Sequence, residues 1–314
     1  MQVVSVSRRT DIPACFAEWF LNRVRAGFAR VPNPFNPRQV TTVSLRPEEL
    51  ACLVFWTRDP RPLLPYLDEL DERGFRSYFQ VTLTGLPQLL EPGVPTESAA
   101  VGAIRELAGR LGPRRVIWRY DPLLLSDLTP PATIVATFDR LSRALEGSVV
   151  RVMVSFLRPY RQVTTRLRRL EREHHLGLRG LGRELPAAER VERQELLARL
   201  AEIGSRRGLR LLTCAEADDY SPQGVPPGAC IDGELIRELW GIDVPARKDP
   251  GQRPECRCIR SVDLGIYGTC RHGCRYCYAA ADLTLTRGRH DPASPILFEQ
   301  VGLPSGGEKN DSNG

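Results

Sequence analysis

Short apolar runs rich in β-branched residues alternate with longer amphipathic segments along most of the chain. The predicted strands are Val3–Val6, Cys52–Trp56, Ser77–Thr82, Arg115–Arg119, Val149–Val154, Arg210–Thr213 and Val262–Tyr267. The predicted helices are Pro13–Ala26, Pro62–Arg73, Ser98–Leu111, Pro131–Leu145 and Ala187–Arg207. Strand–helix alternation is typical of an α/β protein with a mostly parallel sheet covered by helices. Seven such strands favour a complete or partial (β/α) TIM-like barrel over a doubly wound sheet.

The pattern divides the chain into three parts. Residues 1–215 hold the main part of the barrel, with an ordered insertion or hairpin expected at Val31–Val43. Residues 216–303 form a cysteine-rich segment that includes the last predicted strand. Residues 304–314 are polar and rich in glycine, so they have little apolar surface to bury and are expected to be disordered.

Cysteine usage constrains the chemistry because of the compartment that the sequence predicts. No apolar run approaches the roughly 20 residues that span a bilayer, so no membrane partner is expected. The N-terminal residues read as a strand rather than a signal peptide. We therefore expect a cytoplasmic protein, in which thiols stay reduced. Seven of the nine cysteines fall between Cys214 and Cys277, and such clustering in a reducing compartment indicates metal binding rather than disulfides.

The net charge is +6, and only two of the 44 basic residues are lysines. This balance permits a nucleic-acid partner without requiring one. The arginines concentrate in residues 158–193, which also contain His174 and His175. This stretch is either a solvated helix face followed by a loop, or a lid or basic surface for an anionic substrate.

The most specific motif is Cys270-x3-Cys274-x2-Cys277, with the aromatic residue Tyr276 just before the last cysteine. Thiolates are the usual ligands of iron–sulfur clusters. Three cysteines on one loop hold three irons of a cubane and leave the fourth iron without a protein ligand. That open iron can chelate a small molecule through an amine and a carboxylate.

At these residues the chain resembles the radical SAM superfamily, whose hallmark is C-x3-C-x-aromatic-C. The resemblance implies a [4Fe–4S] cluster whose unique iron binds S-adenosylmethionine (SAM). It further implies reductive cleavage of SAM to a 5′-deoxyadenosyl radical. A reductant such as ferredoxin or flavodoxin would then be a partner, and the substrate could be a small molecule, a peptide or a nucleic acid.

The position of the motif differs from the superfamily pattern, in which the cluster loop follows the first barrel strand. Circular permutation reconciles the two if Val262–Tyr267 serves as the first strand and Val3–Val6 as the second. The chain also resembles an uncharacterised family of domains of unknown function with a C-terminal cysteine cluster. Three phrases carry that resemblance, namely Ser5–Pro13, Val54–Arg58 and Ser261–Gly265.

Zinc is the alternative reading of the same loop. Three cysteines and His272 make a normal tetrahedral zinc set. His272, however, lies only two residues from each of two cysteines, which makes simultaneous binding cramped. Ligand softness and spacing therefore favour iron–sulfur.

Four further cysteines precede the motif, namely Cys214, Cys230, Cys256 and Cys258. Four thiolates can complete a second, fully ligated [4Fe–4S] cluster. A structural zinc site and simple buried thiols are the alternatives, because ligand type alone rarely settles the metal. The remaining two, Cys15 and Cys52, read as core residues.

Barrel active sites lie at the C-terminal ends of the strands, which directs attention to two groups of charges. After the first strand, Asp11 could accept from the SAM amine while Arg8 or Arg9 pairs with its carboxylate. Alternatively, Asp11 caps the helix that follows it. Arg119 and Asp121 could contact SAM or substrate, or form an ion pair that stabilises the rim.

The sequence therefore predicts a radical SAM enzyme with an unidentified substrate. The rival prediction is a zinc- or iron–sulfur-stabilised nucleic-acid-binding protein without radical chemistry, which uses the arginines of residues 158–193. Its binding would weaken steeply with salt because phosphate contacts release counterions.

Overall fold

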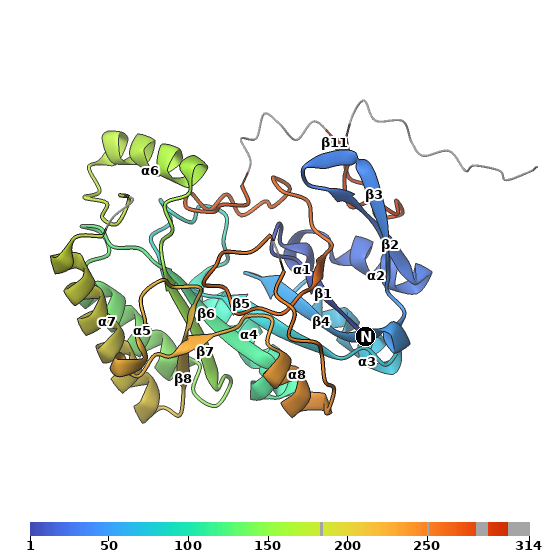
Figure 1. Ribbon diagram of the computed structural model, residues 1–314, viewed down its shortest axis with the longest axis horizontal. Helices are drawn as coiled ribbons and strands as arrows, with labels where there is room; N and C mark the ends of the chain where they lie inside the picture. The colour runs from blue at the N-terminus through green and yellow to red at the C-terminus, as the bar shows by residue number, and fades with distance from the viewer. Residues whose placement is uncertain (183–184, 250, 281–287, 301–314) are drawn as a thin grey trace, which may run out of the picture.

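A computed structural model describes residues 1–182, 185–249, 251–280 and 288–300. The fold is mixed α/β, and its centre is an eight-stranded parallel sheet that curls into a half-barrel (Figure 1). The strands run in the order β10 (Val262–Asp263), β1 (Gln2–Val6), β4 (Leu50–Thr57), β5 (Ser77–Thr82), β6 (Val116–Leu123), β7 (Arg151–Phe156), β8 (Arg210–Cys214) and β9 (Pro227–Gly228). The described helices are α1 (Ile12–Cys15), α2 (Ala17–Ala26), α3 (Leu67–Glu72), α4 (Glu97–Leu111), α5 (Pro131–Ala144), α6 (Arg161–His174), α7 (Ala187–Arg206) and α8 (Gly233–Trp240).

Each predicted strand corresponds to a strand of this sheet, and the amphipathic segments between them are helical. The predicted helix Pro13–Ala26 is divided at Phe16, whose φ of −144° is not helical, into α1 and α2. The insertion after α2 is an antiparallel hairpin of β2 (Phe28–Asn33) and β3 (Asn36–Ser44), as expected. A second small ribbon pairs β11 (Gly288–Arg289) with β12 (Glu299–Gln300).

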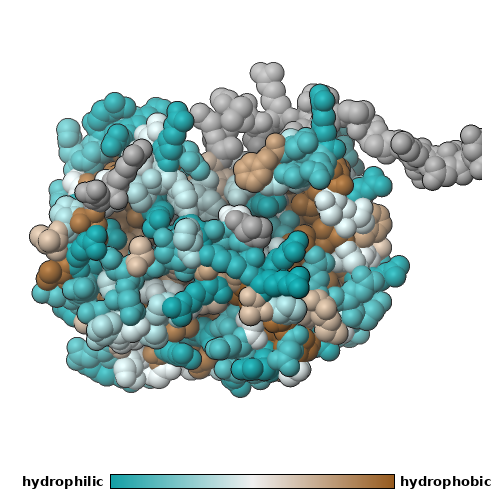
Figure 2. Space-filling model, in the orientation of Figure 1, coloured by the Kyte–Doolittle hydropathy of each residue, from teal (hydrophilic) through white to brown (hydrophobic). Residues whose placement is uncertain are grey.

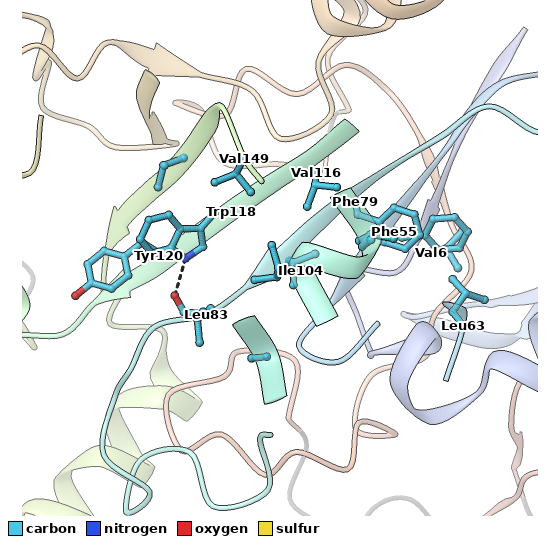
Figure 3. Close-up of a cluster of buried hydrophobic side chains, with 14 of the residues drawn as sticks. Val6, Phe55, Leu63, Phe79, Leu83, Ile104, Val116, Trp118, Tyr120 and Val149 are labelled. Atoms are coloured by element: carbon cyan, nitrogen blue, oxygen red, sulfur yellow. Dashed lines mark hydrogen bonds between the residues drawn. The ribbon is translucent and has the colours of Figure 1, made fainter. Parts of the chain in front are cut away.

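The convex face of the sheet packs against the helices through a continuous apolar core. Figure 3 shows part of this core, in which the rings of Phe55 and Phe79 stack with centroids 4.6 Å apart. Trp118 stacks on Phe138 of α5 at 5.1 Å, and its indole N–H donates to the carbonyl of Leu83 at 2.8 Å. Buried faces on both sides are typical of parallel sheets.

The concave face is filled by the segment that follows β8. Leu235 and Ile236 of α8 pack with inward-facing strand residues such as Val54 and Met153. The carbonyl of Cys230 accepts hydrogen bonds from the Tyr78 hydroxyl and the Gln80 amide, both at 2.8 Å. In Figure 1 this segment, drawn in orange, crosses in front of the sheet.

The sheet does not close into a complete barrel. β10 and β9 are its two edges, and each contains only two residues. The predicted strand Val262–Tyr267 therefore ends early, at Asp263. The reason is local: the Asp263 carboxylate accepts from the backbone N–H of Gly265 at 2.9 Å, which turns the chain away from the sheet edge.

The last part of the chain was predicted to be a disordered tail, and residues 304–314 lie outside the described residues. None of the described helices is long and apolar enough to cross a bilayer. The face of the molecule in Figure 2 is covered mainly by hydrophilic residues, including those over α6.

Candidate functional site

The predicted cluster loop follows β10 and lies at the C-terminal ends of β10 and β1. Its cysteines, Cys270, Cys274 and Cys277, are all partly buried and free of disulfides. The Cys277 N–H donates to the Cys274 carbonyl at 3.2 Å, which forms a turn between these two residues. Gly273 has a φ of +68°, a conformation in which glycine avoids the strain that a side chain would introduce.

The environment of these thiols keeps them neutral in the absence of a cation. Burial raises the pKa of the Cys274 thiol to about 12 and also raises the pKa of Cys277. Charge on neighbouring cysteines of the loop adds to both shifts, so the three sulfurs lie close enough to interact. A bound metal would reverse this preference because thiolates are the metal-binding form.

His272 lies inside the loop with both ring nitrogens engaged. Its Nε2 lies 2.8 Å from Asp11 Oδ2, and its Nδ1 lies 3.0 Å from the carbonyl oxygen of Gly93. Burial lowers the pKa of His272, but the hydrogen bond and charge of Asp11 outweigh it and raise the pKa to about 9. In this conformation neither nitrogen is free to bind zinc, so the pairing with Asp11 orients the loop instead.

Asp11 caps helix α1, as one of its two sequence interpretations requires. Its Oδ1 accepts from the N–H of Ala14 at 3.0 Å. Its Oδ2 accepts from the N–H of Arg58 at 2.7 Å in addition to facing His272. Both carboxylate oxygens therefore have protein partners, and the role of Asp11 towards SAM stays a prediction.

Arg8 and Arg9 lie where β1 meets β10. The Arg8 guanidinium is 3.5 Å from Asp263, 3.6 Å from Asp249 and 3.2 Å from the Ser261 hydroxyl. Arg9 donates to the Gly265 carbonyl at 3.5 Å, and its guanidinium stands 5.5 Å from the centre of a tyrosine ring on the same loop. Both side chains brace the edge of the sheet, and their predicted contacts with SAM remain untested.

Asp263 was not predicted to be important, yet it joins the two strands. Its side chain is 1% exposed. It accepts from the hydroxyls of Ser5 at 2.8 Å and Ser7 at 2.6 Å, and from the Arg8 N–H at 2.8 Å. A Cβ at Gly265 would come within 1.9 Å of the Ser7 hydroxyl, so the chain needs glycine there. The available signal was a carboxylate within an otherwise apolar predicted strand.

Tyr276, the aromatic residue of the motif, is held by a buried polar network around Glu91, a residue that the sequence analysis missed. Its hydroxyl donates to Glu91 and accepts from Arg58. Arg58 and Glu91 form an ion pair at 2.8 Å, with side chains 11% and 3% exposed. Thr84 donates to the same carboxylate at 2.7 Å. A pocket of about 140 Å³ borders this pair at the ends of β4 and β5.

The four cysteines of the predicted second site gather over the concave face of the sheet, beside β5, β6 and β8. The sulfurs of Cys214 and Cys230 are 3.2 Å apart. The thiol of Cys258 interacts with those of Cys230 and Cys256. The fold therefore brings together four cysteines that lie as much as 44 positions apart in the sequence.

Arg119 and Asp121 form the ion pair that one sequence interpretation expected. Their location beside the second cysteine group was not foreseen. Arg119 Nη1 donates to the Cys230 sulfur at 2.8 Å, and its guanidinium lies 4.9 Å from the centre of the Trp56 ring. Asp121 also accepts from the Ser155 hydroxyl.

A row of polar side chains connects the two cysteine groups. The Tyr278 hydroxyl, next to Cys277, donates to the Arg8 carbonyl at 2.9 Å, and the Tyr160 and Tyr278 ring centroids are 5.7 Å apart. Burial lowers the pKa of Arg253, and the charges of Tyr160 and Cys214 outweigh it and raise the pKa. These residues lie between the two cysteine groups.

The part of the chain that the structure describes contains no ready-made site for a single metal ion. No group of three or more His, Cys, Asp or Glu side chains there is arranged to hold one metal ion. A cubane places its thiolates on different irons, so its ligands stand farther apart than those around one ion. Thiols are the donors that iron–sulfur clusters use, and a [4Fe–4S] cluster at either group of cysteines stays a prediction.

Comparisons with known proteins give a family but no characterised relative. No curated protein and no solved structure shows a significant match to the chain. A family described as "Domain of unknown function (DUF1848)" matches residues 3–279, which is most of the sequence. The chain therefore belongs to the DUF1848 family.

Proposed function

We propose that this protein is a radical SAM enzyme that carries a [4Fe–4S] cluster on Cys270, Cys274 and Cys277. When bound and reduced, the cluster would supply the electron that cleaves SAM to a 5′-deoxyadenosyl radical. The observation that carries the proposal is the parallel pairing of β10 with β1, because it brings the motif to the C-terminal edge of a parallel half-barrel.

Circular permutation of a partial (β/α) barrel accounts for the position of the motif. β10 pairs with β1 at Val4↔Val262 and Ser5↔Asp263, and β1 pairs on its other side with β4. The spatial order therefore starts with the strand that precedes the cysteine loop and continues with the N-terminal strand. This order matches a barrel whose first strand has moved to the end of the chain.

The surrounding residues would hold and shield the loop. His272 and Asp11 fix one side of it, and the Tyr276 hydroxyl is tied to Glu91. Arg166 of α6 donates to the carbonyls of Cys277 and Ala280, so the helix lies over the loop. Such cover would limit the access of water to the site. Radical chemistry requires that water be excluded.

The second group, at Cys214, Cys230, Cys256 and Cys258, is proposed to hold another [4Fe–4S] cluster. The donor set of four thiols is complete without further ligands. The hydrogen bond with Cys214 lowers the pKa of the Cys230 thiol, but the hydrogen bond from Cys258 and burial outweigh it and raise the pKa to about 12. The positive charge of Arg119 at the Cys230 sulfur opposes this rise. Electrons would come from a small cytoplasmic carrier such as ferredoxin or flavodoxin.

Anaerobic purification with quantified iron, sulfide and zinc tests the proposal, followed by EPR of the dithionite-reduced protein with and without SAM. We expect about eight irons per chain and a SAM-perturbed [4Fe–4S]⁺ signal, or about four irons if the second site holds zinc. Cys274→Ala should abolish 5′-deoxyadenosine formation, while Cys52→Ala, at a buried cysteine of β4, should retain it.

Two outcomes would contradict the proposal. Full 5′-deoxyadenosine formation by Cys274→Ala would exclude the motif as the cluster site. Zinc alone, with no cluster after reconstitution and with salt-sensitive nucleic-acid binding, would favour the metal-stabilised binding protein instead.

A further inference from the structure

Helix α6 carries an excess of positive charge that the other long helices α4 and α7 do not share. Its 14 residues contain five arginines and two glutamates, whereas α7 contains four of each and α4 two of each. Charges of both signs pair along a solvated helix and stabilise it. A strong excess of one sign instead favours an anionic partner.

Three arginines of α6 form one stripe on the side opposite its buried residues. Arg161, Arg168 and Arg172 are seven and four positions apart, a spacing that places them on one face of a helix. All three are exposed. Arg161 and Arg168 form no salt bridge with any residue that the structure describes. Their charge is therefore available to a ligand.

The same helix lies against the loop of residues 264–280, which follows β10 and carries the cysteine motif. Gln162 donates to the Tyr278 carbonyl at 3.3 Å, and Arg166 donates to the Ala280 carbonyl at 2.8 Å. α6 follows β7 and the loop follows β10, so both leave the sheet at the C-terminal ends of its strands. In Figure 1 both lie at the top of the view. The arginines therefore stand at the mouth of the half-barrel.

The net charge of the protein is concentrated in these two segments. Residues 158–175, which include α6, contain six arginines and two glutamates, and residues 264–280 add two arginines and no acidic residue. With histidine neutral, the two segments together carry a charge of +6, which equals the net charge of the whole chain. The rest of the sequence is balanced. Such a localised positive surface attracts anionic ligands and raises their local concentration.

Exposed aromatic rings lie on the same loop. The side chains of Tyr267 and Tyr278 are exposed, at 42% and 43%. The Tyr267 ring faces the guanidinium of Arg9 at 5.5 Å, and the Tyr278 ring lies beside Tyr160. Among the described residues, the other exposed aromatic side chain is Phe35, at the turn of the β2–β3 hairpin. Rings interleaved with arginines are typical of surfaces that bind single-stranded nucleic acids.

We infer that the mouth of the half-barrel binds an unpaired segment of nucleic acid, with phosphates on the arginines of α6 and bases on Tyr267 and Tyr278. The inference rests on the proposed function and gives it a substrate class. An acidic protein would also be attracted by the arginines, but its carboxylates give no reason for exposed rings beside them. Unpaired bases do, because every base has a flat face that stacks on an aromatic ring.

Fluorescence anisotropy of the full-length protein with labelled oligothymidylate and oligouridylate tests the inference and compares DNA with RNA. Binding should weaken as salt rises, because phosphate contacts release counterions. Combining Arg161→Ala with Arg168→Ala should lower the salt slope by about 1.4 and the affinity roughly 25-fold near ~0.1 M salt, since each contact to a single strand contributes a slope of about 0.7.

A matched control removes the same charge elsewhere. Arg199 of α7 and Arg237 of α8 are exposed, and the double variant Arg199→Ala/Arg237→Ala should bind like wild type. Equal weakening by the two double variants would overturn the assignment of the binding surface to α6, because it would show that only the total charge matters.

Stacking is tested at Tyr267. Tyr267→Ala should weaken binding about five- to 150-fold, the range for one stacked base, and leave the salt slope unchanged. Tyr267→Phe keeps the ring and should restore wild-type affinity. Wild-type affinity in Tyr267→Ala would overturn the stacking. Affinity for duplex DNA or polyglutamate as high as for the single strands would overturn the assignment to unpaired nucleic acid.

These outcomes are distinct from failure of the proposed function. A wild-type protein that binds no oligonucleotide but gives a SAM-perturbed EPR signal contradicts this inference alone. A protein without an iron–sulfur cluster whose oligonucleotide binding depends on Arg161 and Arg168 contradicts the radical SAM function and supports the binding surface.

Discussion

Replacing Asp263 with alanine should destabilise the protein by about 3–5 kcal/mol, the range for removing one member of a buried, charged hydrogen-bond network. The carboxylate is the common acceptor for the hydroxyls of Ser5 and Ser7 and for the N–H groups of Arg8 and Gly265. Each buried donor left without a partner costs roughly 1–3 kcal/mol. Summed over the four donors, this cost could exceed the loss of stability given above. The hydroxyls of Ser5 and Ser7 can rotate towards other acceptors, so the expected loss stays within that range.

Urea denaturation of the metal-free protein measures this effect, with the midpoint and slope compared between variants. Asp263→Asn keeps one acceptor oxygen and should fall between wild type and Asp263→Ala. Asp68→Ala is the matched control: its side chain is 83% exposed and 3.9 Å from its basic partner, so it should stay within about 0.5 kcal/mol of wild type.

The same substitution should reduce iron incorporation, because β10 is joined to β1 at only two register positions. Loss of the carboxylate would free the strand that carries the cysteine loop. A stability change for Asp263→Ala below about 1 kcal/mol, within the range of a single hydrogen bond, would refute the reasoning. It would mean that the four donors find other partners at little cost.

Two further predictions concern the cysteine groups. Gly93→Ala should lower the iron content because the added Cβ would approach the His272 carbonyl oxygen to 2.7 Å. The control Gly102→Ala places its Cβ in open space on α4. It should leave the iron content unchanged and stabilise the protein by about 0.5–1 kcal/mol. Equal iron content in the two variants would contradict this packing argument. Arg119→Gln should reduce the iron content of the second group while the SAM-dependent EPR signal persists. The control Arg114→Gln removes an exposed ion pair with Glu238 and should change neither the iron content nor the EPR signal. Wild-type iron in Arg119→Gln would show that the Cys230 thiolate does not need this charge.

Seven of the eight strands of the sheet could be predicted from sequence because they lie in largely apolar runs that are buried in the structure. Runs such as Cys52–Trp56 need no alternation when helices cover one face and α8 covers the other. β9 and α8 were missed, because a two-residue strand and an eight-residue helix give too short a pattern within a proline- and glycine-rich stretch. α6 lies in the arginine-rich stretch that was interpreted as a solvated helix face followed by a loop or as a lid, and the structure shows a helix whose Val163, Leu167 and Leu170 are buried.

In the candidate site, too, the sequence revealed residues that form a local motif and missed residues that act through long-range contacts. The cysteine motif is local and can be read from eight residues. Asp263 and Glu91 act through contacts with residues 258 and 185 positions away, which no periodicity reveals. Each gave only a weak signal, a charge in a predicted strand and an acidic residue in a loop.

The incomplete barrel gives the two cysteine groups a common structural basis. β9 and β10 are the two edges of the sheet, and the chain between them packs on the concave face. That connecting chain contributes Cys230, Cys256 and Cys258, while β8 supplies Cys214. A metal bound there would fasten the connecting chain to the sheet and so fix the position at which β10 begins. The loop of Cys270 follows β10 directly, so metal at the second group should stabilise the first group even if it transfers no electrons.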